Sequence, residues 1–75
     1  MSRPQKRSFT IAGHRTSVSL EPPFWEALKE IAAGAGLSLA GLVAEIDKAR
    51  GAHGLSTAIR LYVLAHYKEG AQRDR

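Results

Sequence analysis

The chain has 75 residues, no cysteine and a formal net charge of +4 at pH 7. A chain of this length forms one domain at most and buries a small share of its surface, and without cysteine it has no disulfide or thiolate zinc site to support a small core. Association with another chain is the remaining way to complete the core, and a composition without cysteine fits the reducing cytoplasm.

All of the net positive charge lies in the first 20 residues. This stretch has four basic side chains and no Asp or Glu, whereas residues 21–75 have seven basic and seven acidic side chains and are neutral overall. An unopposed basic segment favours a polyanion as partner. Residues 1–7 have no apolar periodicity. We therefore expect residues 1–13 to be a basic arm that leads into the folded domain through a bulge or turn at Gly13.

No segment is typical of export or of membrane insertion. The basic residues near the start are followed by alternating polar and apolar residues, and not by the apolar run of a secretory signal. The longest stretch without charge, residues 31–44, is shorter than the ~20 residues that span a bilayer and contains three glycines. We expect a cytoplasmic protein without a membrane partner.

Residues 14–20 alternate between polar and apolar side chains, which predicts a short β-strand with two faces. The apolar face contains Thr16, Val18 and Leu20, and the polar face contains Arg15, Ser17 and Ser19. A lone strand leaves its backbone groups unpaired, so it needs a partner. That partner is either the segment 9–11, folded back as a hairpin, or the same strand of a second chain. We favour the second chain because it also supplies the missing core.

Three helices are predicted after the strand. Pro22 and Pro23 can begin the first helix, which Gly36 can end in the left-handed conformation. Ser38 is expected to cap a second helix and Ser56 a third, which is apolar nearly all round and continues to about residue 69. The folded domain thus covers residues 14–69, and residues 70–75 are expected to be a disordered tail. The predicted dimer core contains Val18, Leu20, Trp25, Leu28, Leu42, Ile46, Ile59 and Val63.

The order of strand, turn and two helices over residues 15–46 resembles the ribbon-helix-helix proteins of the Arc/MetJ type, a class of dimeric DNA-binding domains. The strand that ends at Leu20, the turn at Pro22 and Pro23, and the turn before Ser38 carry the resemblance. It implies a mainly α fold with one short N-terminal β-strand and an added third helix. It also implies an intertwined homodimer whose two strands form an antiparallel ribbon between subunits, inserted in the major groove.

The resemblance also implies which residues contact DNA. The base-contacting side chains would be Arg15, Ser17 and Ser19, of which only the first has the bidentate fork that selects guanine. The phosphate-contacting residues would be Arg3, Lys6, Arg7, Ser38 and Leu39. Residues 55–69 also resemble the second helix of some family members, and the segment before them would then be an insertion. In that case the phosphate contacts would lie at Ser56 and Thr57, at the start of the third helix.

These features predict a homodimeric DNA-binding protein, a transcriptional regulator of bacterial type. The alternative is an antitoxin-like or scaffold dimer whose third helix docks on a protein partner, with weak or no DNA binding. Its supporting feature is the surplus of apolar residues Leu61, Leu64 and Ala65. We expect no catalytic activity, no metal and no cofactor, because the three histidines form no ligand set and neither a catalytic triad nor a phosphate-binding loop is indicated.

Overall fold

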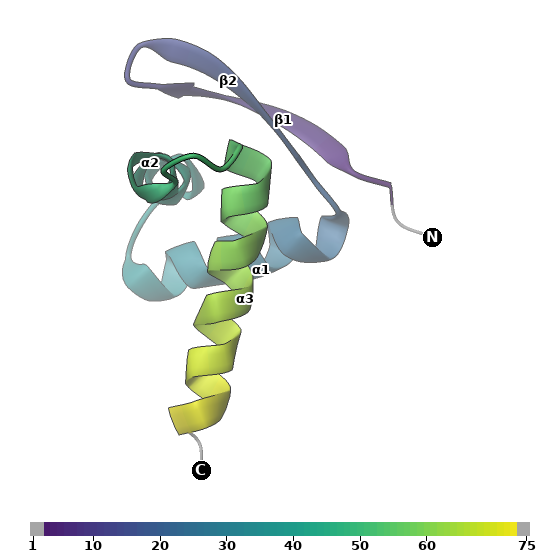
Figure 1. Cartoon of the computed structure of the whole chain (residues 1–75), viewed down its shortest axis with the longest axis vertical. Coiled ribbons are helices and arrows are strands. Elements are labelled where there is room, and N and C mark those ends of the chain that lie inside the picture. Colours follow the sequence, from purple (N-terminus) through teal and green to yellow (C-terminus); the bar gives the residue numbers. More distant parts are fainter. Residues whose placement is uncertain (1–2, 74–75) are drawn as a thin grey trace.

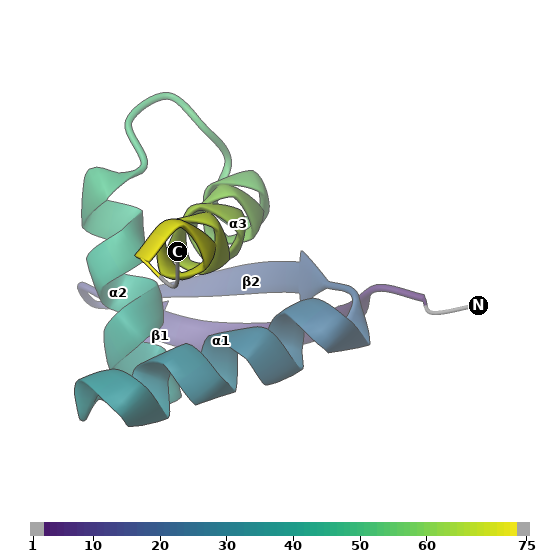
Figure 2. The same cartoon turned by 90° about the horizontal axis from the view of Figure 1, so that it is seen from below.

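The computed structural model describes residues 3–73 and contains a hairpin followed by three helices. Figure 1 shows the hairpin along one side of the body with the helices packed beneath it. Figure 2 shows the first helix on the side of the first strand and the third helix on the side of the second strand. The elements are β1 (Gln5–Ile11), β2 (His14–Leu20), α1 (Pro22–Ala35), α2 (Leu39–Ala49) and α3 (Leu55–Arg73).

The hairpin corrects the expectation of one strand and a long arm. Ala12 and Gly13 both have positive φ, 52° and 82°, which is the two-residue turn whose twist suits antiparallel strands best. Ile11 therefore pairs with His14, and the register continues to Gln5 opposite Leu20. In this structure the partner of β2 is β1 of the same chain, the alternative that we did not favour. The expected arm is thus largely a strand, and its residues 1–2 lie outside the described residues.

The first two helices form where local signals place them. Pro22 opens α1, and Gly36 ends it with a φ of 72°. The N–H groups of Gly36 and Leu37 donate to the carbonyl oxygens of Ala33 and Ala32, a Schellman motif that satisfies the end of the helix. Ser38 caps α2, because its hydroxyl oxygen accepts a hydrogen bond of 2.9 Å from the backbone N–H of Gly41. The predicted bounds of α1 and the predicted cap of α2 are confirmed.

The third helix differs from the prediction at both ends. It begins at Leu55, after Gly54, whose carbonyl oxygen accepts the hydrogen bond from Ala58 N–H. Ser56 is therefore inside the first turn and is not the cap. At the other end α3 continues to Arg73, so most of the expected tail is helical, and residues 74–75 lie outside the described residues.

One chain encloses its own core beneath the hairpin. The eight side chains predicted for the core are each at most 5% exposed within the single chain. None of the buried residues among those described is polar or charged. β1 adds Ile11 to this core and packs Phe9 against it. The eight residues are thus buried within a single chain, and β1 contributes to their burial.

Candidate nucleic-acid interface

The outer face of the hairpin, turned away from the helices, is polar throughout. Because side chains alternate along a strand, the face opposite Val18 and Leu20 is occupied by every second residue of both strands. The outer face consists of three cross-strand pairs: Lys6 with Ser19, Ser8 with Ser17, and Thr10 with Arg15. It has two cations and no acidic side chain. Five of the six residues are exposed, and only Ser19 is half-buried.

The three expected base-contacting residues all lie on this outer face. Arg15 and Ser17 are exposed, and no ion pair of the Arg15 guanidinium occurs within the described part of the chain. Ser19 is more constrained. Its backbone N–H donates to Ser56 Oγ at 3.1 Å, and its carbonyl oxygen accepts from Arg60 at 3.2 Å. Arg15 is therefore the long, charged and free side chain of β2.

β1 brings residues to this face that the sequence analysis missed or assigned otherwise. Ser8 and Thr10 are not among the predicted contact residues, and Lys6 is predicted as a phosphate contact in the basic arm. The signal for Ser8 and Thr10 was present, because Ser8 to Ile11 alternates and Ala12–Gly13 is a two-residue turn, whereas Lys6 is placed only by the register of the pairing. Reading that turn as a hairpin would have placed them opposite β2.

The remaining phosphate candidates are dispersed. Arg3 is exposed ahead of β1. Arg7 is on the inner side of β1, where its guanidinium lies over the Trp25 ring at 5.1 Å from the centroid. Ser38 and Leu39 begin α2, beside the end of α1 (Figure 2). The structure thus brings together Arg15, Ser17, Ser19 and Lys6, and separates them from Arg7 and from the start of α2.

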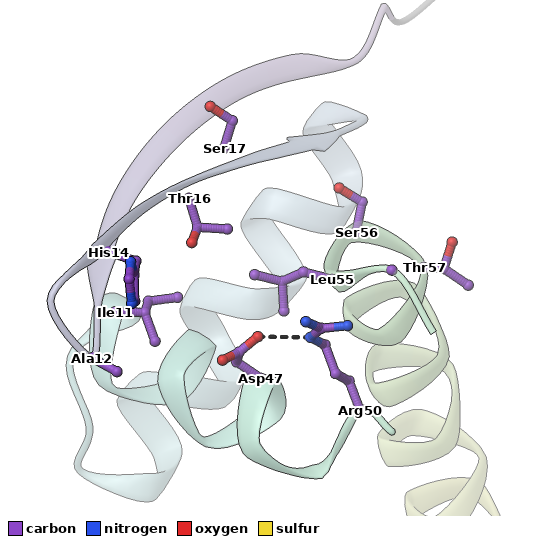
Figure 3. Close-up of a pocket in the computed structure, with 11 residues that line it drawn as sticks. Ile11, Ala12, His14, Thr16, Ser17, Asp47, Arg50, Leu55, Ser56 and Thr57 are labelled. Carbon is purple, nitrogen blue, oxygen red and sulfur yellow. Dashed lines mark hydrogen bonds and ion pairs between the residues drawn. The ribbon is translucent and has the colours of Figure 1, made fainter. Parts of the chain in front are cut away.

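A hollow of about 550 Å³ with a mixed polar and apolar lining flanks β2 (Figure 3). Its polar lining residues come from β2, the end of α2 and the first turn of α3: His14, Thr16, Asp47, Arg50, Ser56 and Thr57, with Ser17 at its border, where the side chain points away to the outer face. The charges in it are paired, because Arg50 donates to Asp47 Oδ1 at 2.8 Å and to the His53 carbonyl oxygen. The first-turn amides of α3 have no partner within the helix, so this end of α3 is suited to an anion beside β2.

A clamp at the end of β2 holds α3 against the hairpin. The Arg60 guanidinium donates to both carboxylate oxygens of Glu21, at 3.0 and 3.3 Å, and also to the Ser19 carbonyl oxygen. Arg60 also lies over the Phe24 ring, 5.9 Å from the centroid. With the Ser56 contact, both outward backbone groups of Ser19 are satisfied by α3. The edge of β2 at this residue is therefore covered.

Acidification is expected to loosen this clamp. A hydrogen bond from its own backbone, followed by the Arg60 guanidinium, holds the pKa of Glu21 below its ordinary value of 4.5. Because the folded pKa is the lower one, the stabilisation is complete above pH 4.5 and is lost as the pH falls through the folded value. Thermal unfolding followed by circular dichroism from neutral to acidic pH should show this loss in the wild type. The profile of Glu21→Gln should lack it, and identical profiles would contradict the role of the clamp.

The described part of the chain contains neither a metal cluster nor a single membrane-spanning helix. No group of three or more His, Asp or Glu side chains within residues 3–73 could hold a metal ion. No single helix in that range is long and apolar enough to cross a membrane, and α1 and α2 meet the length and composition only as a pair bent by 97°.

The comparison with protein families decides the identity. A model described as a ribbon-helix-helix domain matches residues 4–67, which is most of the chain. The chain belongs to the ribbon-helix-helix family. This confirms the resemblance that the sequence indicated and extends it to β1 and α3. No curated protein and no solved structure matches the chain.

Membership of the ribbon-helix-helix family places the chain among DNA-binding, non-enzymatic domains typical of transcriptional regulators. In these domains the ribbon is the element that enters DNA. In this ribbon-helix-helix domain both strands of the hairpin come from one chain. The hairpin therefore corresponds to the ribbon of the family, and its outer face is the candidate surface for base contacts.

Proposed function

We propose that this chain regulates transcription by laying the outer face of its hairpin in the major groove of duplex DNA. The observation that carries the proposal is the chemistry of that face: six polar side chains, two cationic and none acidic, on a two-stranded ribbon. Neighbouring strands lie about 4.8 Å apart, and the major groove is about 12 Å wide and admits a two-stranded ribbon. The major groove of duplex RNA is too narrow for such an element, so DNA is the expected partner.

Base recognition is expected to centre on one cross-strand pair. Arg15 can donate two hydrogen bonds to the O6 and N7 atoms of guanine, the most selective contact available here. Thr10 lies directly opposite and can place its methyl group against a thymine methyl. Ser8 and Ser17, also opposite each other, have hydroxyls that donate or accept and so discriminate bases weakly. Ser19 is in addition partly covered by α3.

Phosphate contacts would surround this ribbon. Lys6 and Arg3 are exposed near the start of the hairpin, and the first turn of α3 with Ser56 and Thr57 lies beside β2. The free amides at the start of α2, with Ser38 and Leu39, are a second position for a phosphate. Such contacts set register and affinity without sequence preference. We also propose that the protein acts as a homodimer and in the cytoplasm, where bacterial-type regulators meet their DNA.

The test is DNA binding by Arg15→Ala. A preferred site is first selected with the wild type from a pool of random-sequence duplexes, and affinity is then measured by fluorescence anisotropy at two salt concentrations. Loss of the bidentate contact should weaken binding to the selected site by about 10- to 100-fold. Binding to unrelated duplex should fall much less, because it depends on phosphate contacts.

The matched control is Lys29→Ala, which removes the same charge from an exposed position of α1. It should bind the selected site nearly as tightly as the wild type. If Arg15→Ala and Lys29→Ala weaken binding equally, the hairpin does not read bases. Absence of any selected site at low salt would contradict DNA binding itself.

A second candidate function is protein binding through α3, as in an antitoxin-like or scaffold dimer. The observation that favours it is the exposure of Leu61 and Leu64, which the single-chain core does not use. In that case DNA binding would be weak and insensitive to Arg15→Ala, whereas a purified partner would protect these leucines from solvent.

A further inference from the structure

The start of α3 lies beside β2 and bonds to the strand at one residue, Ser19 (Figure 1). Its backbone N–H donates to Ser56 Oγ at 3.1 Å, and its carbonyl oxygen accepts from Arg60 at 3.2 Å. In an antiparallel pair, every second residue of a strand points its backbone N–H and C=O groups away from the partner strand. Arg15 and Ser17 share that direction with Ser19, but within residues 3–73 only Ser19 exchanges hydrogen bonds with α3. The helix therefore fixes the hairpin at one end.

Arg60 joins three elements at this end of the hairpin. Its guanidinium donates to both carboxylate oxygens of Glu21, at 3.0 and 3.3 Å, and lies over the Phe24 ring of α1. Glu21 is the residue before α1, and its carbonyl oxygen accepts the first backbone hydrogen bonds of that helix, from Phe24 and Trp25. Arg60 thus connects α3, the end of β2 and the start of α1. The donors of a planar guanidinium leave in fixed directions, so this junction fixes angles as well as distances.

The junction is a lever for the proposed base contact. Arg15 is four residues before Ser19 in β2, and a strand rises about 3.3 Å per residue, so about 13 Å of strand separates them. A swing of about 10° at Ser19 would move Arg15 by about 2 Å, whereas a binding constellation tolerates only about 0.5 Å. The apolar core under the hairpin holds its inner face, but hydrophobic contact is not directional. The polar junction therefore supplies the angular restraint.

The same junction sets the hairpin against the second part of the proposed DNA contact. Ser56 and Thr57 are in the first turn of α3, one turn before Arg60, and they line the hollow beside β2. Phosphate contacts there would position the duplex, and base contacts from the hairpin would read it. One duplex can make both contacts only if their separation on the protein is held constant.

We propose that Arg60 is a positioning residue for base recognition, which holds the hairpin at the angle where Arg15 and the first turn of α3 contact one duplex together. The proposal rests on the proposed function and adds to it a residue outside the outer face of the hairpin that determines specificity. The other role open to this cation is direct contact with a phosphate, because its side chain is 33% exposed. The two roles differ in what they predict for DNA of unrelated sequence.

The first experiment compares Arg60→Ala with Lys68→Ala by fluorescence anisotropy, on the selected duplex and on an unrelated duplex, over a range of salt concentrations. Lys68 is exposed further along α3, so its loss removes the same charge from the same helix. Arg60→Ala should lower the ratio of the two affinities by about 10-fold, because a displaced Arg15 loses part of its bidentate contact. Its salt slope should stay near that of the wild type, whereas loss of one phosphate contact would lower the slope by about 0.9. Lys68→Ala should keep the wild-type ratio.

The second experiment uses Glu21→Ala, which frees Arg60 without removing a cation. Positioning predicts that the affinity ratio falls at least about 3-fold, since the guanidinium keeps only its bond to the Ser19 carbonyl oxygen. Binding to the unrelated duplex should be equal or stronger, because an acidic side chain is lost. A direct phosphate contact by Arg60 predicts tighter binding to both duplexes and an unchanged ratio. This variant also decides the question if Arg60→Ala does not fold.

The control for stability is Ile31→Val. Ile31 is 6% exposed in the second half of α1, and its truncation destabilises the fold without removing a group from the junction. It should keep the wild-type affinity ratio at a temperature where circular dichroism shows every variant to be folded. A fall in the ratio equal to that of Arg60→Ala would show that loss of stability is sufficient, and would overturn the proposal.

A wild-type ratio in both Arg60→Ala and Glu21→Ala also overturns the proposal. So does an equal loss of affinity for both duplexes in Arg60→Ala, with a lower salt slope. These results leave the proposed function intact, because the wild type would still prefer its selected site and Arg15→Ala would still remove that preference. A wild type without a preferred site overturns the proposed function and the positioning role together.

Discussion

Replacing Trp25 with alanine is expected to lower the free energy of unfolding by about 3–5 kcal/mol. Trp25 is 2% exposed and joins β1 to α1 through three separate contacts. Its ring packs on Phe9 at a centroid distance of 6.0 Å, lies under the Arg7 guanidinium, and its Nε1–H donates to the Gln5 carbonyl oxygen at 3.0 Å. Its loss would leave a cavity and would remove the donor to the Gln5 carbonyl oxygen.

The size of this loss matters because the chain is short. At about 0.05–0.15 kcal/mol per residue, a domain of this length has roughly 4–11 kcal/mol in total, so the variant should be close to unfolding at physiological temperature. Urea unfolding measures the free energy of unfolding of the variant. It is followed by circular dichroism and not by fluorescence, because the substitution removes the single tryptophan.

The control for this prediction is Trp25→Phe, which keeps an aromatic ring and removes the N–H donor. It should cost less than half as much as the alanine, because most of the loss comes from the buried ring and not from the hydrogen bond. If the two variants are equally unstable, the hydrogen bond to Gln5 dominates and the packing argument is wrong.

Replacing Ile59 with alanine is expected to cost about 2–5 kcal/mol and to release α3 from the hairpin. Ile59 is fully buried, and α3 contributes only three other residues to the core: Leu55, Ala58 and Val63. Because one of them is already an alanine, Ile59 and its two large neighbours provide nearly all of the apolar contact that holds this helix. The Ser56 and Arg60 contacts to Ser19 depend on that docking.

Urea unfolding measures the loss of stability in Ile59→Ala, and hydrogen exchange shows which part of the structure it affects. The amide of Ser19 should lose protection in Ile59→Ala, since its acceptor is Ser56 Oγ. His66→Ala, one turn beyond the core on the same helix and exposed, should change neither measurement by more than about 0.5 kcal/mol. An Ile59→Ala protein with unchanged protection at Ser19 would show that α3 is held by the polar clamp alone.

The intrachain hairpin changes how this ribbon-helix-helix domain would engage DNA. Where two chains share a ribbon, dimerisation and reading are one event. Here Ser17 faces Ser8 and Arg15 faces Thr10 within a single chain, so the surface that we propose reads DNA is complete in one chain.

The elements that follow from local rules could be read from the sequence alone. The start of α1 at Pro22, its end at Gly36 and the cap of α2 at Ser38 depend on backbone preferences within a few residues, and the alternation over residues 14–20 placed Arg15 and Ser17 on the polar face. The eight core residues followed from the same periodicities.

The tertiary structure decided what depends on residues far apart in the chain. The sequence left the partner of β2 undecided, because a strand of the same chain or of a second chain could satisfy the same backbone groups. In the structure the chain's own β1 pairs with β2, Phe9 packs on the Trp25 ring, and Trp25 donates a hydrogen bond to the Gln5 carbonyl oxygen. Ser56 looked like a helix cap but accepts a hydrogen bond from Ser19, 37 residues away. For a helix that is apolar nearly all round, periodicity cannot select the buried face. Only the packing of α3 against β2, α2 and α1 decides that Ile59 is buried and Leu64 is exposed.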